Sequence, residues 1–475
     1  MIDFKNIEKY RENNRIEAKK ALGGLPKSIW ETYSAFANTL GGIILLGVEE
    51  WPDKTLHTVN LPDPDRLIRE FWDIVNNPER TSVNLLSSKD IFVQEVDGDH
   101  IIVINVPQAE RSYRPVYVDG NPLFSYRRNG EGDYKCTKEE YQAMVRDAAT
   151  KTQDMRVLNE IDMSALSKES VCSYRRRMHL ARPGHTWESL ADDDFLLKLG
   201  AAGIGSDSRM HPTAAGLLMF GNEFDIVREY NNYFLDYQEQ SGENALWEER
   251  IISSSGDWSG NVYDFYFRVY DKLTQNVNFS QKTEVHQALR EALANCLINA
   301  DYYGRQGLVI IKKLNSITMS NPGNFRIKVD AAKSGGMSDP RNGAIQKMFN
   351  LIDIGKRAGS GIPNIFRVWR NQDWPDPEII ESFDPDRITL SLVLEKRTGE
   401  KAPVKTASKK VAVKLRIKET IIAYLTYHAE AETSEIAEYI GLKPSRTRIY
   451  LNELISGGIV VTEGGKKNRR YKLKA

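Results

Sequence analysis

Three polar side chains recur at four-residue steps in the segment 288–302. Glu291, Asn295 and Asn299 return to one face of a helix, because four residues make about one turn. A glutamate can activate water, and an asparagine one turn later can hold a magnesium ion through its amide oxygen. This face therefore predicts ATP hydrolysis, with Mg²⁺ held by Asn295. The alternative interpretation is an amphipathic helix with an exposed polar stripe.

A second group of charged residues lies near the amino terminus. Glu12 and Glu17 are five residues apart, Lys19 follows them, and Glu49 and Glu50 come directly after an apolar run. Carboxylates of this kind can hold a divalent cation for phosphodiester cleavage, while a lysine braces the phosphate charge. Ordinary acidic residues on a solvated helix face give the same spacing, so both interpretations stand.

The carboxyl-terminal segment 401–475 is basic. It holds 16 Lys and Arg against 7 Asp and Glu, a net charge of +9, although the whole chain has 65 of each and is neutral. Such a segment favours nucleic acid or an acidic partner. Three helical patterns at 416–427, 433–440 and 445–456 precede a hairpin pattern, and this order predicts a winged helix-turn-helix.

The third helix and the hairpin of this segment offer groups for phosphates and base edges. The candidates for nucleic-acid binding are Arg446, Arg448, Asn452, Lys466, Lys467, Arg469 and Arg470. Winged helices also serve as docking or dimerisation modules, but the positive charge favours DNA. A separate run, Arg175 to Arg177, is interpreted as a solvated helix face.

The elements that must position these groups indicate a multidomain chain of mixed α/β and α+β class. Its 475 residues suggest two to four domains. Helix, strand and turn patterns divide it into 1–150 as an α/β domain, 151–280 as a connecting helical and mixed region, 281–396 as a two-layer α/β sandwich, 397–415 as a linker, and 416–475 as the winged helix.

Cysteine usage and apolar runs bear on the compartment. Cys136, Cys172 and Cys296 form no CxxC pair and are too scattered for a disulfide framework, which fits a reducing compartment. The start of the chain lacks the apolar core of a secretory signal, and no apolar run is long enough to cross a bilayer. We expect a cytoplasmic protein with no membrane partner.

The amino-terminal motifs resemble the Schlafen-type AlbA domain over about residues 8–148. The resemblance rests on the Glu12-x4-Glu17-Ala18-Lys19 entry, the segment 34–42 (SAFANTLGG), the run 45–49 (LLGVE) and the segment 126–130 (YRRNG). Some members of that family are implied to be RNA endonucleases that use two glutamates and an aspartate, with Mg²⁺ or Mn²⁺. Here Glu12 and Glu17 match the pair, and Glu49, Glu50 and Asp53 all fall near the third position.

The segment 288–302 and later motifs resemble the ATPase region labelled RecG-like, a divergent branch of the GHKL fold, over about residues 190–395. The resemblance implies Glu291 as general base and Asn295 as magnesium ligand. It also implies an adenine-side loop and a phosphate lid whose glycines allow close backbone approach. The nucleotide-binding candidates are Asn295, Asn299, Asn321, Gly323, Arg341, Lys356, Arg357, Gly359 and Gly361.

Two departures from that family favour nucleotide binding over fast hydrolysis. The family commonly has His-Arg-Asp-Tyr where this chain has the segment 299–302 (NADY), and Ser320 or Asn321 stands where orthodox members have the adenine-reading Asp. There is no GxxxxGK[ST] motif, which excludes a P-loop helicase. The sequence therefore leaves the chain's standing as an ATPase or a nuclease open.

Three functions follow from the motifs in series. The leading one is a nucleotide-controlled nucleic-acid-binding protein, either a transcription regulator or an antiviral defence switch, that works as a homo-oligomer on DNA or RNA. The second is a metal-dependent endoribonuclease acting on transfer RNA. The third is a transcription factor whose ATP region has become a structural dimer module.

Overall fold

The computed structural model describes residues 2–240, 248–275, 283–355, 359–396, 418, 421, 424–425, 430–440, 444–456, 459–463 and 469–473. The chain divides into two compact units, Met1–Arg397 and Thr398–Ala475. Among the described residues, no helix combines the length and apolarity that crossing a bilayer requires.

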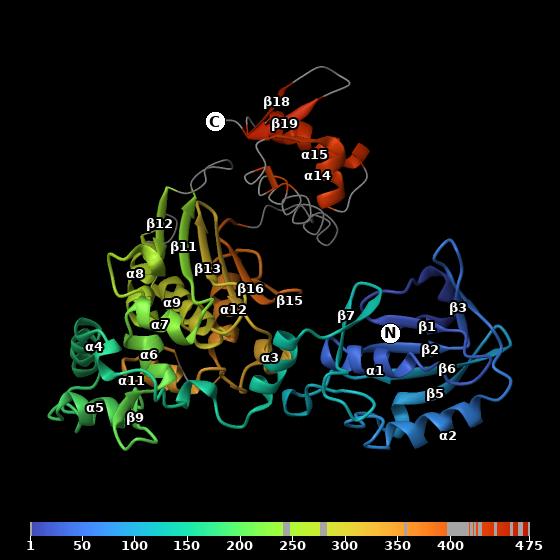
Figure 1. Cartoon of the computed structure of the whole chain (residues 1–475), viewed down its shortest axis with the longest axis horizontal. Coiled ribbons are helices and arrows are strands. Elements are labelled where there is room, and N and C mark those ends of the chain that lie inside the picture. Colours follow the sequence, from blue (N-terminus) through green and yellow to red (C-terminus); the bar gives the residue numbers. More distant parts are fainter. Residues whose placement is uncertain are drawn as a thin grey trace. The chain divides into compact units, whose positions relative to one another are not determined.

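The amino-terminal part of the first unit is built on a four-stranded sheet in the order β1-β2-β6-β5, in which β1 and β2 are parallel and the other neighbours are antiparallel (Figure 1). Its elements are η1 Phe4–Lys9, β1 Ile16–Lys19, α1 Ile29–Asn38, β2 Gly42–Leu46, β3 Val48–Glu50, β4 Leu56–Thr58, α2 Pro64–Val75, η2 Ser88–Asp90, β5 Ile91–Val96, β6 Asp99–Val106, η3 Arg111–Tyr113, β7 Tyr126–Asn129, β8 Gly132–Lys135 and α3 Lys138–Ala148.

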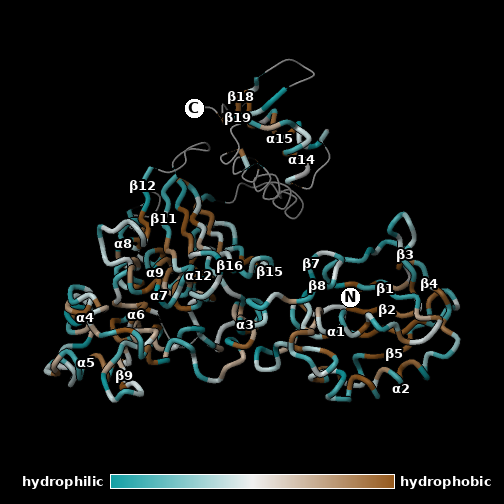
Figure 2. The backbone as a smooth tube through the Cα atoms, in the orientation of Figure 1, coloured by the Kyte–Doolittle hydropathy of each residue, from teal (hydrophilic) through white to brown (hydrophobic). Residues whose placement is uncertain are grey.

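The central strands of this sheet are apolar on both faces, and Figure 2 shows hydrophobic residues along β2. Because side chains alternate along a strand, Ile44 and Leu46 pack against α1 and α2, whereas Leu45 and Val103 face a second core. Helix α2 begins at Pro64, where the side chain of Asp63 accepts a hydrogen bond from the amide of Arg66. The expected α/β domain is confirmed.

The rest of the first unit shares one large hydrophobic core from Leu158 to Leu394. Its elements are η4 Gln153–Met155, η5 Met163–Ala165, α4 Lys168–Ala181, α5 Asp192–Leu199, β9 Ala202–Ile204, β10 Met210–Pro212, α6 Ala214–Phe220, α7 Glu223–Glu229, β11 Leu235–Gln240, β12 Glu249–Ile252, η6 Ser253–Ser255, α8 Val262–Thr274, α9 Thr283–Ile298, β13 Leu308–Lys313, β14 Ser316–Pro322, α10 Val329–Ser334, α11 Gly343–Leu351, α12 Gly361–Asn371, β15 Glu378–Phe383 and β16 Asp386–Val393.

A six-stranded sheet in the order β12-β11-β13-β14-β16-β15 is the centre of this core. Only β11 and β13 are parallel neighbours. Helix α9 contacts β14, helix α12 packs on α9, and α8 packs on α9 and β11, which makes a two-layer α/β arrangement (Figure 1). Because β11 and β12 belong to this sheet, a single sheet spans the domain boundary expected at residue 281.

Two local expectations differ from the structure. The helix expected across 288–302 ends at Ile298, because the side-chain amide of Asn299 caps the carbonyl of Asn295 (3.0 Å). The amide of Asp301 then binds the carbonyl of Pro322 (2.9 Å) at the end of β14 and draws the chain away from the helix axis. The run Arg175 to Arg177 differs from a solvated face at one residue: Arg176 and Arg177 are exposed, whereas Arg175 is half-buried and donates to two backbone carbonyls.

In the second unit, β17 Ala431–Glu432, β18 Val460–Glu463 and β19 Arg470–Leu473 form a sheet in the order β17-β19-β18, and two helices, α14 Thr433–Tyr439 and α15 Pro444–Ser456, precede the hairpin. Its core joins these elements through residues such as Ile436, Leu451 and Tyr471. The expected helix at 416–427 lies mostly outside the described residues, although Ile421 and Leu425 belong to this core.

Candidate functional site

A cavity opens between α9, α12 and the sheet strands β14, β15 and β16. The residues that line it come from separate stretches of the chain: Ala292, Asn295, Cys296, Asn299, Met319, Asn321, Asn324, Phe325, Arg326, Ile327, Ala332, Met337, Ser338, Asp339, Pro340, Arg341, Gln346, Gly359, Gly361, Ile362, Ile365, Phe366, Ile379, Ile388 and Leu390. The nucleotide-binding candidates that the structure describes all belong to this set except Gly323, which contacts the lining residue Arg341.

Glu291 and Asn295 lie on the face of α9 that meets the start of α12. A Cβ atom on Gly361 would lie 2.9 Å from Asn295 Nδ2 and 3.4 Å from Glu291 Oε2, so glycine leaves both side chains room. Glu291 Oε2 is buried and has no hydrogen-bond partner among the described residues. A buried carboxylate oxygen without a partner fits a cation or a water molecule as its missing neighbour. Glu291 itself stands beside the cavity and does not line it.

The loop before α12 also depends on glycine. Gly359 has a φ of +60°, and a Cβ there would overlap the backbone of Met337. Glycine therefore lets this loop pass close to the backbone of Met337, and phosphate lids require the same backbone freedom. The two cationic candidates of this loop, Lys356 and Arg357, lie outside the described residues.

The loop after β14 is held by Arg341. Gly323 has a φ of +99°, and its missing Cβ makes room for the guanidinium of Arg341. That guanidinium donates to the carbonyls of Asn299 (3.1 Å) and Asn324 (2.8 Å) and to the carboxylate of Asp147. Burial lowers the pKa of Arg341, but the carboxylates of Asp147, Asp301 and Asp386 together more than offset this, so the pKa is raised. Arg341 therefore stabilises the cavity wall, since each guanidinium nitrogen already donates to a protein acceptor.

Sequence reasoning missed several polar residues of the cavity, among them Asn324 and Arg326. Both are largely buried, and each has one side-chain atom, Asn324 Oδ1 and Arg326 Nε, without a hydrogen-bond partner among the described residues. They lie directly after the loop at 321–323, so the signal that could have found them is a polar pair beside a loop already suspected of binding. Their burial is a tertiary property that the sequence does not display.

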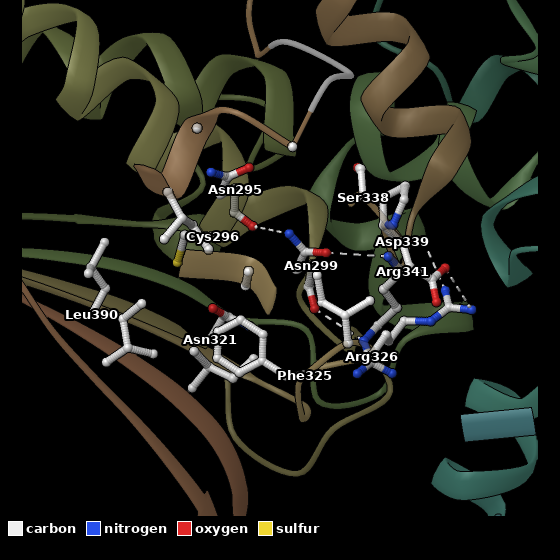
Figure 3. A pocket seen from close by; sticks show the side chains of 18 of the residues that line it. Asn295, Cys296, Asn299, Asn321, Phe325, Arg326, Ser338, Asp339, Arg341 and Leu390 are labelled. Atoms are coloured by element: carbon white, nitrogen blue, oxygen red, sulfur yellow. Dashed lines mark hydrogen bonds and ion pairs between the residues drawn. The ribbon is translucent and has the colours of Figure 1, made fainter. Parts of the chain in front are cut away.

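The opposite side of the cavity is apolar. Figure 3 shows Leu390 and Cys296 on one side of the view and Ser338, Asp339, Arg326 and Arg341 on the other. Burial raises the pKa of the Cys296 thiol to about 12, so the sulfur is an apolar lining group and not a nucleophile. The cavity therefore offers an apolar half and a charged half, which suits a ligand with a flat apolar ring and a polar end.

The amino-terminal acids are close together, but Glu17 is already paired. Glu17 accepts from Lys19 Nζ (2.8 Å) and from Arg128 Nη2 (2.7 Å). Glu12 accepts from the amide of Ala18 (3.0 Å). Burial raises the pKa of Glu12, and the neighbouring charges of Glu17 and Glu50 raise it further. The three carboxylates therefore repel one another.

The third acid of this group is Glu50. Alternation along β3 turns Glu49 the other way, toward Lys20 (3.0 Å), and Asp53 closes its own turn by accepting from Thr55 (3.0 Å). Glu50 Oε1 is buried without a hydrogen-bond partner among the described residues. Even so, the part of the chain that the structure describes has no group of three His, Cys, Asp or Glu residues arranged to hold a metal ion.

The SAFANTLGG segment has a structural role. Asn38 is fully buried, and its amide donates to the carbonyls of Val116 (2.8 Å) and Tyr126 (3.1 Å) while its oxygen accepts from the amide of Val116 (2.8 Å). Gly41, with a φ of +70°, lies where a Cβ would be 2.8 Å from the backbone of Gln108. The motif therefore holds the end of α1 against the chain that leads to Arg128.

In the second unit, the described candidates lie on exposed surfaces of α15 and β19. Arg446, Arg448, Asn452 and Arg469 are exposed. Arg470 is also exposed but pairs with the carboxylate of Glu430. Exposed pairs of this kind contribute little energy and can exchange for a phosphate. Lys466 and Lys467 lie outside the described residues.

Family models match the chain in three places. Residues 12–137 match the family described as Schlafen, AlbA_2. The chain carries a Schlafen AlbA_2 domain. Residues 311–390 match the family described as "Putative ATP-dependent DNA helicase recG C-terminal", so the expected RecG-like region follows the Schlafen domain. Residues 142–236 match a domain of unknown function, DUF8451. Together these matches indicate a nucleic-acid-related ATPase or binding function.

Solved structures give two further likenesses. The crystal structure of the DIP2311 protein from Corynebacterium diphtheriae is 14% identical, with 97% of this chain and 95% of that chain covered and a TM-score of 0.40. The solution NMR structure of the N-terminal domain of a "Putative ATP-dependent DNA Helicase RecG-related Protein" from Nitrosomonas europaea is 31% identical, with 29% of this chain and 95% of that chain covered and a TM-score of 0.23. Both TM-scores are too low to define the fold of this chain. No curated protein matches it.

Proposed function

We propose that this protein binds ATP in the α9–α12 cavity and that the bound nucleotide controls its binding of DNA or RNA. The observation that carries the proposal is the cavity itself, which joins an apolar half to a charged half within a RecG-like region. Gly359 and Gly361 line the cavity without Cβ atoms, and Glu291 Oε2, beside the cavity, lacks a hydrogen-bond partner among the described residues.

The proposed chemistry assigns each side chain one task. Asn295 would hold Mg²⁺ through its amide oxygen, and the metal, when bound, would neutralise phosphate charge. Glu291 would orient a water molecule and accept its proton. The apolar residues around Leu390 would exclude water from the adenine base of the nucleotide. The carbonyl of Asn295, capped by Asn299, fixes the end of α9 and so the position of this face.

In this proposal, the bound nucleotide changes the affinity of the chain for nucleic acid. The Schlafen AlbA_2 domain and the basic second unit are two candidate nucleic-acid surfaces on one chain. The order of α14, α15 and the β18–β19 hairpin suits a winged helix-turn-helix, and Arg446 and Arg448 on α15 would then meet DNA. We infer a cytoplasmic homo-oligomer that acts as a transcription regulator or an antiviral defence switch.

Calorimetric titration of the full chain with ATP and ADP, with and without Mg²⁺, tests the nucleotide step. Asn295→Ala should lower the affinity for Mg²⁺–ATP, whereas Glu291→Gln should keep binding and lose any hydrolysis. Asn371→Ala, at the exposed end of α12, is the matched control that should change neither. Absence of ATP binding by the wild-type chain would refute the proposal.

Fluorescence anisotropy with labelled duplex DNA and single-stranded RNA tests the control step. The affinity should differ between the ATP-bound and nucleotide-free chain, and Arg446→Ala should weaken DNA binding and reduce its salt dependence. An affinity that is the same with and without ATP would leave an ATP-binding protein without the proposed switch.

A second candidate function is RNA cleavage at Glu12, Glu17 and Glu50. Mutual repulsion among these carboxylates favours it, because a divalent cation would relieve the repulsion that raises the pKa of Glu12. For that, Glu17 would have to exchange Lys19 or Arg128 for a metal, with Lys19 turning to the phosphate. Incubation with transfer RNA and Mn²⁺ or Mg²⁺ tests it, since Glu50→Gln should abolish cutting; products that persist in the variant would come from a contaminant.

A further inference from the structure

Arg326 lines the charged half of the cavity, and the groups around it neutralise its positive charge only in part. Its side chain is 6% exposed. Its Nη1 donates to the carbonyl of Pro340 (2.9 Å) and its Nη2 lies 3.5 Å from the carbonyl of Asp147, but Nε has no hydrogen-bond partner among the described residues. Carbonyl groups satisfy hydrogen bonds but do not cancel a full charge. A buried guanidinium in this state fits an anion as its missing partner.

The carboxylate nearest to Arg326 is shared. Asp339 lies 3.6 Å from Arg326 Nη2, but it is bound more closely by Arg111, whose Nε is 2.5 Å from Asp339 Oδ2. The other neighbouring carboxylate, Asp147, is bound by Arg341. Three guanidiniums therefore share two carboxylates at this end of the cavity. The pKa of Arg326 is lowered, chiefly by burial; the charges of Asp339 and Asp147 oppose this, and those of Arg111 and Arg341 add to it.

We propose that Arg326 binds the anionic end of a nucleoside polyphosphate, and that Arg111 of the Schlafen AlbA_2 domain keeps Arg326 available by holding Asp339. This rests on the proposed function and deepens it, because it adds a phosphate-binding residue and makes the Schlafen domain part of the nucleotide site. Arg111 does not line the cavity, and it reaches Asp339 from η3, 228 residues earlier in the chain.

Because Arg111 and Arg326 share Asp339, the proposal predicts for each substitution whether ATP binding becomes tighter or weaker. Among the described residues, the Asp339 carboxylate without Arg111 has only Arg326 as a close cationic partner, so it competes with the incoming phosphate. Without the Asp339 charge, the Arg326 guanidinium loses that competitor and should bind phosphate more tightly. The amide of the Asp339→Asn variant is close to the carboxylate in size, so this change alters charge with little change of shape. A purely structural role of these residues predicts no such opposite effects.

The test compares ATP with adenosine, because only ATP carries the anionic end. Calorimetry of the full chain is run in EDTA, so that Asp339 cannot act through a metal. Arg326→Gln should weaken ATP binding by about tenfold to about a hundredfold and leave adenosine binding unchanged. Arg111→Ala should weaken ATP binding in the same selective way, and Asp339→Asn should strengthen it. Arg367→Gln, an exposed arginine on α12, is the control.

The outcomes separate this inference from the proposed function. If the wild-type chain binds neither ATP nor adenosine in EDTA and does not bind ATP with Mg²⁺ either, the proposed function fails and this inference fails with it. If ATP binds only when Mg²⁺ is present, the proposed function stands and this inference is refuted, because Arg326 then does not hold the anionic end. If it binds both but Arg326→Gln keeps the wild-type ratio of ATP to adenosine affinity, the role of Arg326 is refuted while the nucleotide site stands. Should Arg326→Gln not fold, Asp339→Asn and Arg111→Ala decide: weaker ATP binding by Asp339→Asn, or unchanged binding by Arg111→Ala, overturns the inference.

Discussion

Replacing Gly361 by alanine should separate the stability of this protein from its affinity for nucleotide. Gly361 is the first residue of α12, and its φ is not in the left-handed region, so alanine is compatible with the backbone. A glycine replaced at such a position raises the free energy of unfolding by about 0.4–1 kcal/mol, because the unfolded chain loses freedom. The new methyl group, however, would meet the cavity side of α9.

The size of the binding effect follows from the distances at this position. The alanine Cβ would lie 2.9 Å from Asn295 Nδ2 and 3.4 Å from Glu291 Oε2. Side-chain ends can move by a few tenths of an ångström, so the fold tolerates the methyl group, but Asn295 must leave the place from which it would hold Mg²⁺. Loss of one polar contact to a charged ligand costs about 1.5–3 kcal/mol, which corresponds to about a tenfold to about a 150-fold loss of Mg²⁺–ATP affinity.

The assay pairs calorimetry with thermal unfolding. Gly343→Ala is the matched control, because Gly343 is also the first residue of a helix, α11, and its Cβ would meet only the side chain of Thr152 at 3.4 Å. Both variants should unfold within about 1 kcal/mol of the wild type, and only Gly361→Ala should lose affinity. Wild-type affinity in Gly361→Ala would refute the assignment of this face of α9 to the nucleotide.

Three further predictions concern the Schlafen AlbA_2 domain and its attachment. Asn38→Ala should lower the free energy of unfolding by about 2–4 kcal/mol, measured by denaturation, because it strands the buried backbone groups of Val116 and Tyr126. Arg127→Ala should lower the free energy of unfolding by about 3–5 kcal/mol, because it removes one partner of a largely buried, two-point ion pair with Asp386. The control Arg80→Ala, in the exposed pair with Asp119, should change the free energy of unfolding by less than about 1 kcal/mol. Equal effects of the two substitutions would contradict this prediction. Glu12→Gln should stabilise the protein near neutral pH but not in acid below the ordinary pKa of a glutamate. Burial raises the pKa of Glu12 in the folded state, so the wild-type chain loses stability as the pH rises from the ordinary pKa of a glutamate through the raised one. Denaturation of both chains at two pH values measures the difference, and a difference that does not change with pH would count against it.

The sequence by itself determined the elements and one face of the site. Helical patterns predicted α14 and α15, and four-residue spacing placed Glu291 and Asn295 together on α9, because local geometry fixes which side chains share a face. The glycine at position 359 was also singled out, and its left-handed φ and close approach to the Met337 backbone suit glycine. Each of these depends on residues close in the chain.

Tertiary structure alone decided what completes the site. Asp339 meets Arg111 across 228 residues, and the apolar side of the cavity comes from β15 and β16, which no motif marks. The same holds for Glu17, whose sequence predicts a metal ligand but whose carboxylate is paired with Arg128 through a contact 111 residues away. Contacts between distant residues depend on how buried surfaces pack and how buried charges find partners, and neither is written in the local spacing of residues.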